Sequence, residues 1–348
     1  MLLCVCLVLL VIFWRSRPAA REQGCFTDYM DPAYTTAIKG VFILLIFLTH
    51  GEQYLTLSDS LPDRIYSIIR LGLGQSVVTA FFFYSGYGMT VSLRRKGEAY
   101  LSAFPRMRIL KTLLHFDIAV LLYLIAALAM QWPLTSGEII WSFIGWESLG
   151  NSSWFIFDIL VAYVMFYACF RLCRDLHKSA VLFTALSIVF VVLMVLFQES
   201  RYYNTFLSVS MGIWFCLYQE KIERGLHSRG KVLALFAVLA AAYVAGGVLL
   251  MPFYDTYEYL YIPLPLIFMT ALLLLTMVWR FDNPVLRYFG EHLFSVFILM
   301  RLPMELLEFA GVTNVYVFMA LSLLCTVALA HVFDLFLQKL DQVLFRPR

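Results

Sequence analysis

Long apolar runs separated by short polar segments recur along almost the whole chain. Most of them are 17 to 22 residues long, which is enough for an α-helix to cross the ~30 Å hydrocarbon core of a bilayer. The pattern therefore predicts an all-α fold, a polytopic transmembrane helical bundle. Its ten core spans are expected near residues 36–54, 71–92, 110–131, 154–173, 179–198, 203–220, 231–251, 259–279, 289–309 and 314–336.

The first apolar run, Met1 to Trp14, is shorter and carries its basic residues after it, beginning with Arg15. A secretory signal has its positive charge before the apolar run and a small-residue cleavage site after it. The order here predicts an uncleaved anchor span with its N-terminus outside. We expect an anchor and cytoplasmic linker over residues 1–32, a transmembrane domain over 33–336 and a basic cytoplasmic tail over 337–348.

Basic residues are concentrated on one side of this threading. Of the 26 Lys and Arg residues, 22 lie in the segments 15–39, 92–111, 171–178, 219–231, 279–288 and 334–348. The positive-inside rule makes that side cytoplasmic, including the C-terminus. The expected location is the plasma membrane, with the lipid bilayer as a partner.

Composition excludes several other classes. The chain is 62% hydrophobic and 14% charged, against ~25% charged in soluble domains. It has no Walker loop, dinucleotide fingerprint or H-E-x-x-H motif, so nucleotide hydrolysis and zinc proteolysis lack support. Neither a metal site nor a nucleic-acid partner is expected.

The first core span carries two polar side chains on the same helix face. Lys39 and His50 are eleven residues apart, which places them on one helix face with a rise of roughly 16 Å between them. Polar groups at that depth are costly in lipid and usually functional. The alternative is a snorkelling Lys39 and a His50 that is hydrogen-bonded inside the bundle.

Four short motifs follow one another along the predicted spans. They are Lys39-x10-His50, Phe81–Tyr87 followed by Arg94–Lys96 and Pro105–Arg108, Trp154-Phe155 with Leu160 and Tyr163, and Gly290-x4-Ser295. In this order they resemble the type-three acyltransferase family, integral membrane enzymes that acylate cell-surface glycans and related acceptors. Two features depart from the family pattern: Lys39 replaces the commoner Arg, and Phe297–Met300 stands where many relatives have Tyr-Leu-x-His.

The resemblance, over roughly residues 33–336, implies an acyltransferase domain that moves an acyl group, by default acetyl, from cytoplasmic acyl-coenzyme A to an acceptor hydroxyl. It implies catalytic roles for His50 and Lys39, with His50 acting either as general base or as nucleophile. The anionic nucleotide end of the donor would meet the cytoplasmic loop, unless that loop only sets topology. Its expected donor-binding residues are Arg94, Arg95, Arg106, Arg108 and Lys111.

Further polar and aromatic residues are expected to contact substrate. They are Tyr84, Ser85, Trp154, Asp158, Arg301 and Glu305. Aromatic residues crowd the outer segments 132–153 and 252–263, where they could form an interfacial belt, stack on sugar rings, or do both. Arg301 either lines the acceptor side near His50 or pairs structurally with Glu305, with Pro303 kinking the helix between them.

Two other function classes stay open. A transporter or flippase would use a buried polar path formed by His50, His115, Asp117, Asp158 and Arg301. A membrane sensor that kept the fold and lost the chemistry would account for the missing late histidine.

Overall fold

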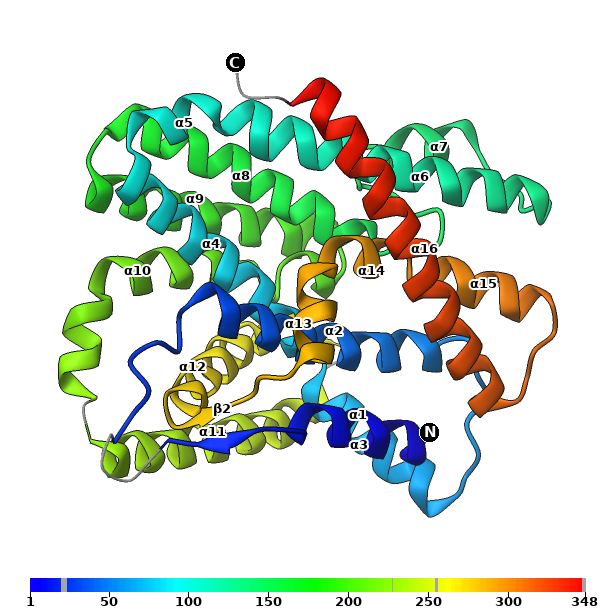
Figure 1. Cartoon of the computed structure of the whole chain (residues 1–348), viewed down its shortest axis with the longest axis horizontal. Helices are drawn as coiled ribbons and strands as arrows, with labels where there is room; N and C mark the ends of the chain where they lie inside the picture. Colours follow the sequence, from blue (N-terminus) through cyan, green and yellow to red (C-terminus); the bar gives the residue numbers. More distant parts are fainter. Residues whose placement is uncertain (20–23, 227, 254–255, 346–348) are drawn as a thin grey trace.

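The computed structural model describes residues 1–19, 24–226, 228–253 and 256–345. These ranges are mostly helical, with one antiparallel pair of two-residue strands, β1 (Arg17–Pro18) and β2 (Trp279–Arg280) (Figure 1). The all-α prediction is therefore confirmed. The helices are α1 (Leu2–Phe13), α2 (Pro32–Glu52), α3 (Leu61–Leu73), α4 (Ser76–Lys96), α5 (Glu98–Phe104), α6 (Lys111–Ala129), α7 (Ser136–Ser142), α8 (Ser153–Cys173), α9 (Leu176–Phe197), α10 (Leu207–Gly225), α11 (Arg229–Leu250), α12 (Pro263–Val278), α13 (Pro284–Glu291), α14 (Leu293–Leu299), α15 (Arg301–Phe309) and α16 (Val315–Leu344).

Eight helical runs among the described residues are long and apolar enough to cross a membrane. They coincide with eight of the eleven predicted spans. The other three predicted spans, 1–14, 203–220 and 289–309, correspond to shorter, more polar or interrupted helices: α1, α10 and the pair α14 and α15. The multi-pass helical bundle is thus confirmed, and the crossing of these three segments stays a prediction.

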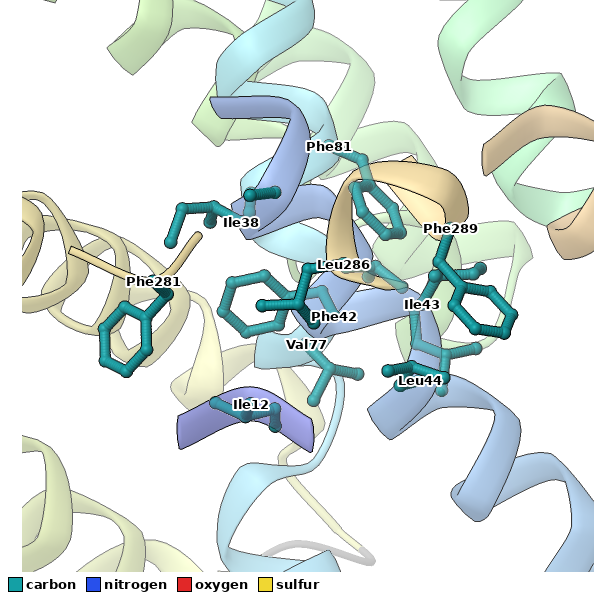
Figure 2. Close-up of a cluster of buried hydrophobic side chains, with 14 of the residues drawn as sticks. Ile12, Ile38, Phe42, Ile43, Leu44, Val77, Phe81, Phe281, Leu286 and Phe289 are labelled. Atoms are coloured by element: carbon teal, nitrogen blue, oxygen red, sulfur yellow. The ribbon is translucent and has the colours of Figure 1, made fainter. Parts of the chain in front are cut away.

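Helix α2 lies at the centre of the main hydrophobic core. Its apolar side chains Ile38, Phe42, Ile43 and Leu44 pack among residues from α1, α4 and α13 (Figure 2). Because the buried residues of α2 lie on several of its faces, the helix is enclosed largely by other parts of the bundle.

Helices α2 and α13 touch backbone to backbone. A Cβ atom at Gly40 would lie 1.9 Å from the carbonyl oxygen of Leu286, and one at Gly290 would lie 1.9 Å from that of Thr36. Only glycine leaves room for this approach, so the two helices are held in a fixed register.

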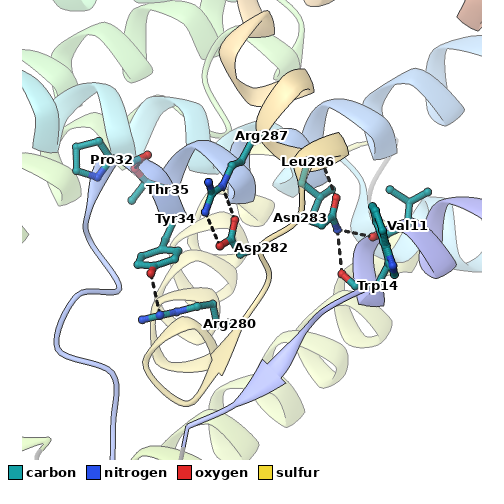
Figure 3. Close-up of polar contacts among 10 residues, drawn as sticks. All are labelled: Val11, Trp14, Pro32, Tyr34, Thr35, Arg280, Asp282, Asn283, Leu286 and Arg287. Atoms are coloured by element: carbon teal, nitrogen blue, oxygen red, sulfur yellow. Dashed lines mark hydrogen bonds and ion pairs between the residues drawn. The ribbon is translucent and has the colours of Figure 1, made fainter.

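A polar joint ties the chain's first segment to the start of α13. The Asn283 side chain accepts a hydrogen bond from the backbone N–H of Leu286, capping α13, and donates to the carbonyls of Val11 and Trp14 (Figure 3). Next to it, β1 pairs with β2. The segments 15–39 and 279–288, predicted on the same membrane side, are therefore neighbours.

The two ends of the chain pack into the bundle. Helix α1 lies against α2, α3 and α13, and its N-terminal ammonium is 3.0 Å from Oδ1 of Asp63. Helix α16 continues through the predicted domain end at 336 as far as Leu344. Residues 346–348 of the predicted basic tail lie outside the described residues.

Candidate active site

A cavity of about 890 Å³ occupies the half of the bundle that was predicted to face the cytoplasm. Its walls come from α2, α4, α5, α6, α8 and α14 and from the turn between α5 and α6. The polar or charged residues that line it are Lys39, Tyr84, Ser85, Lys96, Tyr100, Arg108, Lys111, Thr112, His115 and Tyr163. Five sequence-predicted residues are thus brought together: Lys39, Tyr84, Ser85, Arg108 and Lys111. The Lys39 ammonium lies 5.7 Å from the centre of the Tyr84 ring.

Four cations converge on this one cavity: Lys39, Lys96, Arg108 and Lys111. Because all four positively charged side chains line the same space, the cavity is suited to binding an anion. Lys96 belongs to the predicted basic loop and lines the cavity together with Arg108 and Lys111 of the same loop.

The other predicted donor-binding residues lie outside the cavity lining. Arg94 donates a hydrogen bond to the carbonyl of Cys216, 3.0 Å away, and Arg106 donates to that of Leu344, 2.5 Å away. Arg95 is exposed at the end of α4. The structure therefore separates the basic loop into residues that reach the cavity and residues that hold the surrounding helices.

A π-helical turn, Pro105–Leu110, joins α5 to α6. Proline has no N–H to offer to the preceding turn, and a π turn widens the helix locally, which changes the direction in which side chains point. Arg108 and Met107 of this turn both line the cavity. The turn thus directs the guanidinium of Arg108 inward, where it lies beside Tyr100 and Tyr163.

The end of α16 covers the basic side of the cavity. Asp341 pairs with Nζ of Lys111 at 2.6 Å and with Nε2 of His115 at 2.8 Å. The Phe345 ring lies about 6 Å from the cationic groups of Arg106 and Lys111. Sequence reasoning missed this arrangement because Asp341 is more than two hundred residues from its partners.

His50 does not line the cavity. It lies near the other end of α2, where its Nε2 is 3.3 Å from Oγ of Ser152, the residue that precedes α8. Its Nδ1 is buried without a hydrogen bond in the described part of the chain. Of the two, Lys39 lines the cavity and His50, farther along the same helix, does not.

Arg301 and Glu305 gather near His50 through a tyrosine that the sequence analysis did not single out. Nε of Arg301 donates to the Tyr54 hydroxyl at 3.0 Å, and that hydroxyl donates to Oε1 of Glu305 at 3.3 Å. Within the described residues, Arg301 and Glu305 form no direct ion pair, because Tyr54 lies between them. Tyr54 follows His50 by four residues in the chain, so its hydrogen bond brings Arg301 to the same end of α2.

Two expected substrate residues, Asp158 and Trp154, do not line the cavity. Asp158 is fully buried and forms no hydrogen bond with the described residues. Trp154 stacks edge-on against Phe155 and does not line the cavity. No group of three or more His, Cys, Asp or Glu residues in the described ranges could hold a metal ion.

Comparison with known proteins fits this arrangement. A family model described as an acyltransferase domain matches residues 33–333, which is most of the chain and includes every cavity wall. A search of curated proteins and a search of solved structures gave no match. On the strength of the family match, the chain belongs to the type-three acyltransferase family and is a multi-pass membrane acyltransferase.

Proposed function

We propose that this enzyme transfers a short acyl group, acetyl foremost, from cytoplasmic acyl-coenzyme A to a hydroxyl of a cell-surface glycan or a related acceptor. The observation that carries the proposal is the presence of a four-cation cavity at Lys39 and of a partly buried histidine farther along the same helix. The membrane concerned is the plasma membrane, with the cavity and the C-terminus on the cytoplasmic side.

The donor has an anionic nucleotide end and a long neutral arm that ends in the thioester. In this proposal Lys96, Arg108 and Lys111 hold the phosphates, because charge-assisted hydrogen bonds to anionic oxygens are the strong ones. Lys39 supplies a further positive charge deeper in the cavity. Tyr84 and Ser85 line the wall along which the neutral arm would run.

His50 would act as general base. It would accept the proton of the acceptor hydroxyl while the hydroxyl oxygen attacks the thioester carbon. A C–O bond forms, the C–S bond breaks, and the proton passes from the imidazole to the departing thiolate. A transient acyl-imidazole, in which His50 attacks the thioester first, uses the same residue and gives the same products.

The acceptor would approach from the outer side, where His50, Tyr54, Arg301 and Glu305 gather. The guanidinium of Arg301 is suited either to an acidic acceptor or to the oxyanion that develops on the thioester carbonyl. Aromatic residues of the outer segments, Trp154 included, would supply flat faces for sugar rings.

The test uses inverted membrane vesicles that contain the enzyme and receive acetyl-coenzyme A labelled in the acetyl group. We expect label to accumulate on a glycan or small acceptor inside the vesicles, and not in vesicles that carry the His50→Ala variant. Label that enters unattached would indicate transport, and label that stays on the donor with every acceptor offered would indicate a protein without transferase activity.

A further inference from the structure

Three phenylalanine rings meet at the inner end of the cavity. Phe81 of α4, Phe155 of α8 and Phe297 of α14 contact one another pairwise, with ring centroids 6.0 Å apart for Phe81 and Phe155, 6.5 Å for Phe81 and Phe297, and 5.0 Å for Phe155 and Phe297. All three line the cavity. They form a closed triangle of rings, which we call the phenylalanine triangle.

The triangle lies between the cavity and His50. On each of its three helices, the phenylalanine is the lining residue farthest from the basic side of the cavity. Three residues before Phe155, Ser152 contacts His50, and four residues after Phe297, Arg301 donates a hydrogen bond to Tyr54, which follows His50 by four residues. A group that passes from the cavity to His50 between α4, α8 and α14 therefore meets these rings.

The triangle is apolar and tightly supported. Phe81 and Phe297 are each 3% exposed, whereas Phe155 is partly exposed and also packs against Phe82, with ring centroids 4.8 Å apart. A charged group would lose its hydration there without gaining a partner. A wide group would have to displace rings that are packed on their outer sides.

We infer that the phenylalanine triangle is a gate that selects the acyl group by its width and charge. This inference rests on the proposed function. Slim, uncharged acyl groups such as acetyl and propionyl pass between the rings to His50, whereas branched, aromatic or carboxylated acyl groups are held back on the cavity side. The partly exposed ring of Phe155 is the one that moves when the gate opens.

The first test compares acetyl- with isobutyryl-coenzyme A as donors for the wild type and for Phe155→Ala. Removing one ring should raise the ratio of kcat/KM for isobutyryl over acetyl by about tenfold or more, since a pocket distinguishes small apolar groups by roughly 10- to 200-fold. The matched control is Phe157→Ala on the same helix, whose ring contacts Trp146 and Tyr202 and lies outside the cavity lining. It should leave the ratio unchanged.

The second test needs no acyl transfer. A cysteine placed at Ser152 should react slowly with a bulky, membrane-impermeant maleimide added from the cavity side, and at least several-fold faster when Phe155→Ala is also present. Labelling is measured above the background of the seven native cysteines. If Phe155→Ala does not give folded protein by size-exclusion chromatography, Phe155→Leu serves in both tests with the same expected direction.

The outcomes separate the gate from the proposed function. An active wild type whose donor ratio does not change in Phe155→Ala overturns the gate and leaves the proposed function standing. A wild type that uses no acyl-coenzyme A overturns the proposed function, and the labelling rate then decides whether the rings close the passage. Equal labelling rates with and without Phe155→Ala overturn the gate in either case.

Discussion

The hydroxyl oxygen of Ser152 lies 3.3 Å from Nε2 of His50, and this contact links the start of α8 to the last turn of α2. Ser152 is itself buried, so this contact is made away from bulk water. A hydrogen bond to one ring nitrogen fixes the orientation of the imidazole and leaves the other nitrogen to face a reacting group. Ser152 is therefore a residue that positions His50.

His50→Ala should abolish acyl transfer without unfolding the protein. A general base contributes roughly 10²- to 10⁴-fold to the rate, and the substitution removes a polar group without stranding a charge. The measurement is kcat with labelled donor, together with size-exclusion chromatography of the purified variant. The matched control is His177→Ala, since His177 packs against Trp214 and Tyr218 and lies outside the cavity lining. Activity of His50→Ala within a few-fold of the wild type would remove His50 from the mechanism.

Arg108→Ala should raise the KM for acyl-coenzyme A by about tenfold, the size expected for one lost charge-assisted hydrogen bond. Because exposed charge interactions are screened by salt, the wild-type KM should rise with ionic strength, and this rise should be weaker in the variant. Steady-state kinetics at several salt concentrations measure both effects. Arg95→Ala, an exposed arginine outside the cavity, is the control. A lowered kcat with an unchanged KM would instead assign Arg108 to a conformational step.

Arg301→Gln should fold and bind the donor with an unchanged KM, but lower kcat by about 10²-fold, the cost of losing one group that stabilises developing charge. Tyr54→Phe should have a smaller effect in the same direction, because Tyr54 only holds Arg301 in place. The double variant with Glu305→Gln tests the alternative role. If Arg301→Gln fails to fold and the double variant folds again, Arg301, Tyr54 and Glu305 form a structural group that does not contact substrate.

Gly40→Ala should destabilise the protein by at least about 1–3 kcal/mol, the usual cost of forcing extra atoms into a packed contact. The added methyl group would meet the backbone carbonyl of Leu286, which has no side-chain freedom with which to move away. The thermal midpoint in detergent measures the effect. Gly247→Ala on α11 is the control, because a Cβ there would meet nothing within 4 Å. An equal midpoint for both variants would contradict the close approach of α2 and α13.

Introduced cysteines test the sidedness of the bundle. Cysteines at Gly97 and Ser228 should be labelled by an impermeant reagent only from the cytoplasmic side, and one at Thr256 only from outside, as the distribution of basic residues requires. Sealed vesicles of known orientation provide the measurement. Labelling of the Thr256 position from the cytoplasm alone would invert the threading and place the basic cavity outside.

The fold class could be predicted because hydropathy alone sets which segments form long helices. The position of the break near Arg301 could also be foreseen: α14 ends at Leu299, whose carbonyl is the group that Pro303 cannot bond. What the sequence could not give was the separation of Lys39 from His50. They share a helix face, but the rings that close the space between them come from three other helices.

Partners distant in the chain were missed for a related reason. Tyr54 meets Arg301, and Asp341 meets Lys111 and His115, across more than two hundred residues. Nothing in the local pattern around a single tyrosine or aspartate marks it as a partner. Only the packing of α16 and α15 against the rest of the bundle brings these side chains together.

The backbone contact between Gly40 and Leu286 fixes the position of α2 relative to α13. With α2 clamped near Lys39, the rise of roughly 16 Å from Lys39 to His50 is set by helix geometry alone. Inserting one residue between them would rotate His50 by about 100° around the helix axis and increase its axial distance from Lys39 by only about 1.5 Å. The ten residues between Lys39 and His50 therefore hold these two side chains at a fixed distance, to which the reach of the donor would be matched under the proposed function. Substitutions on the sides of this segment should be tolerated far better than any change in its number of residues.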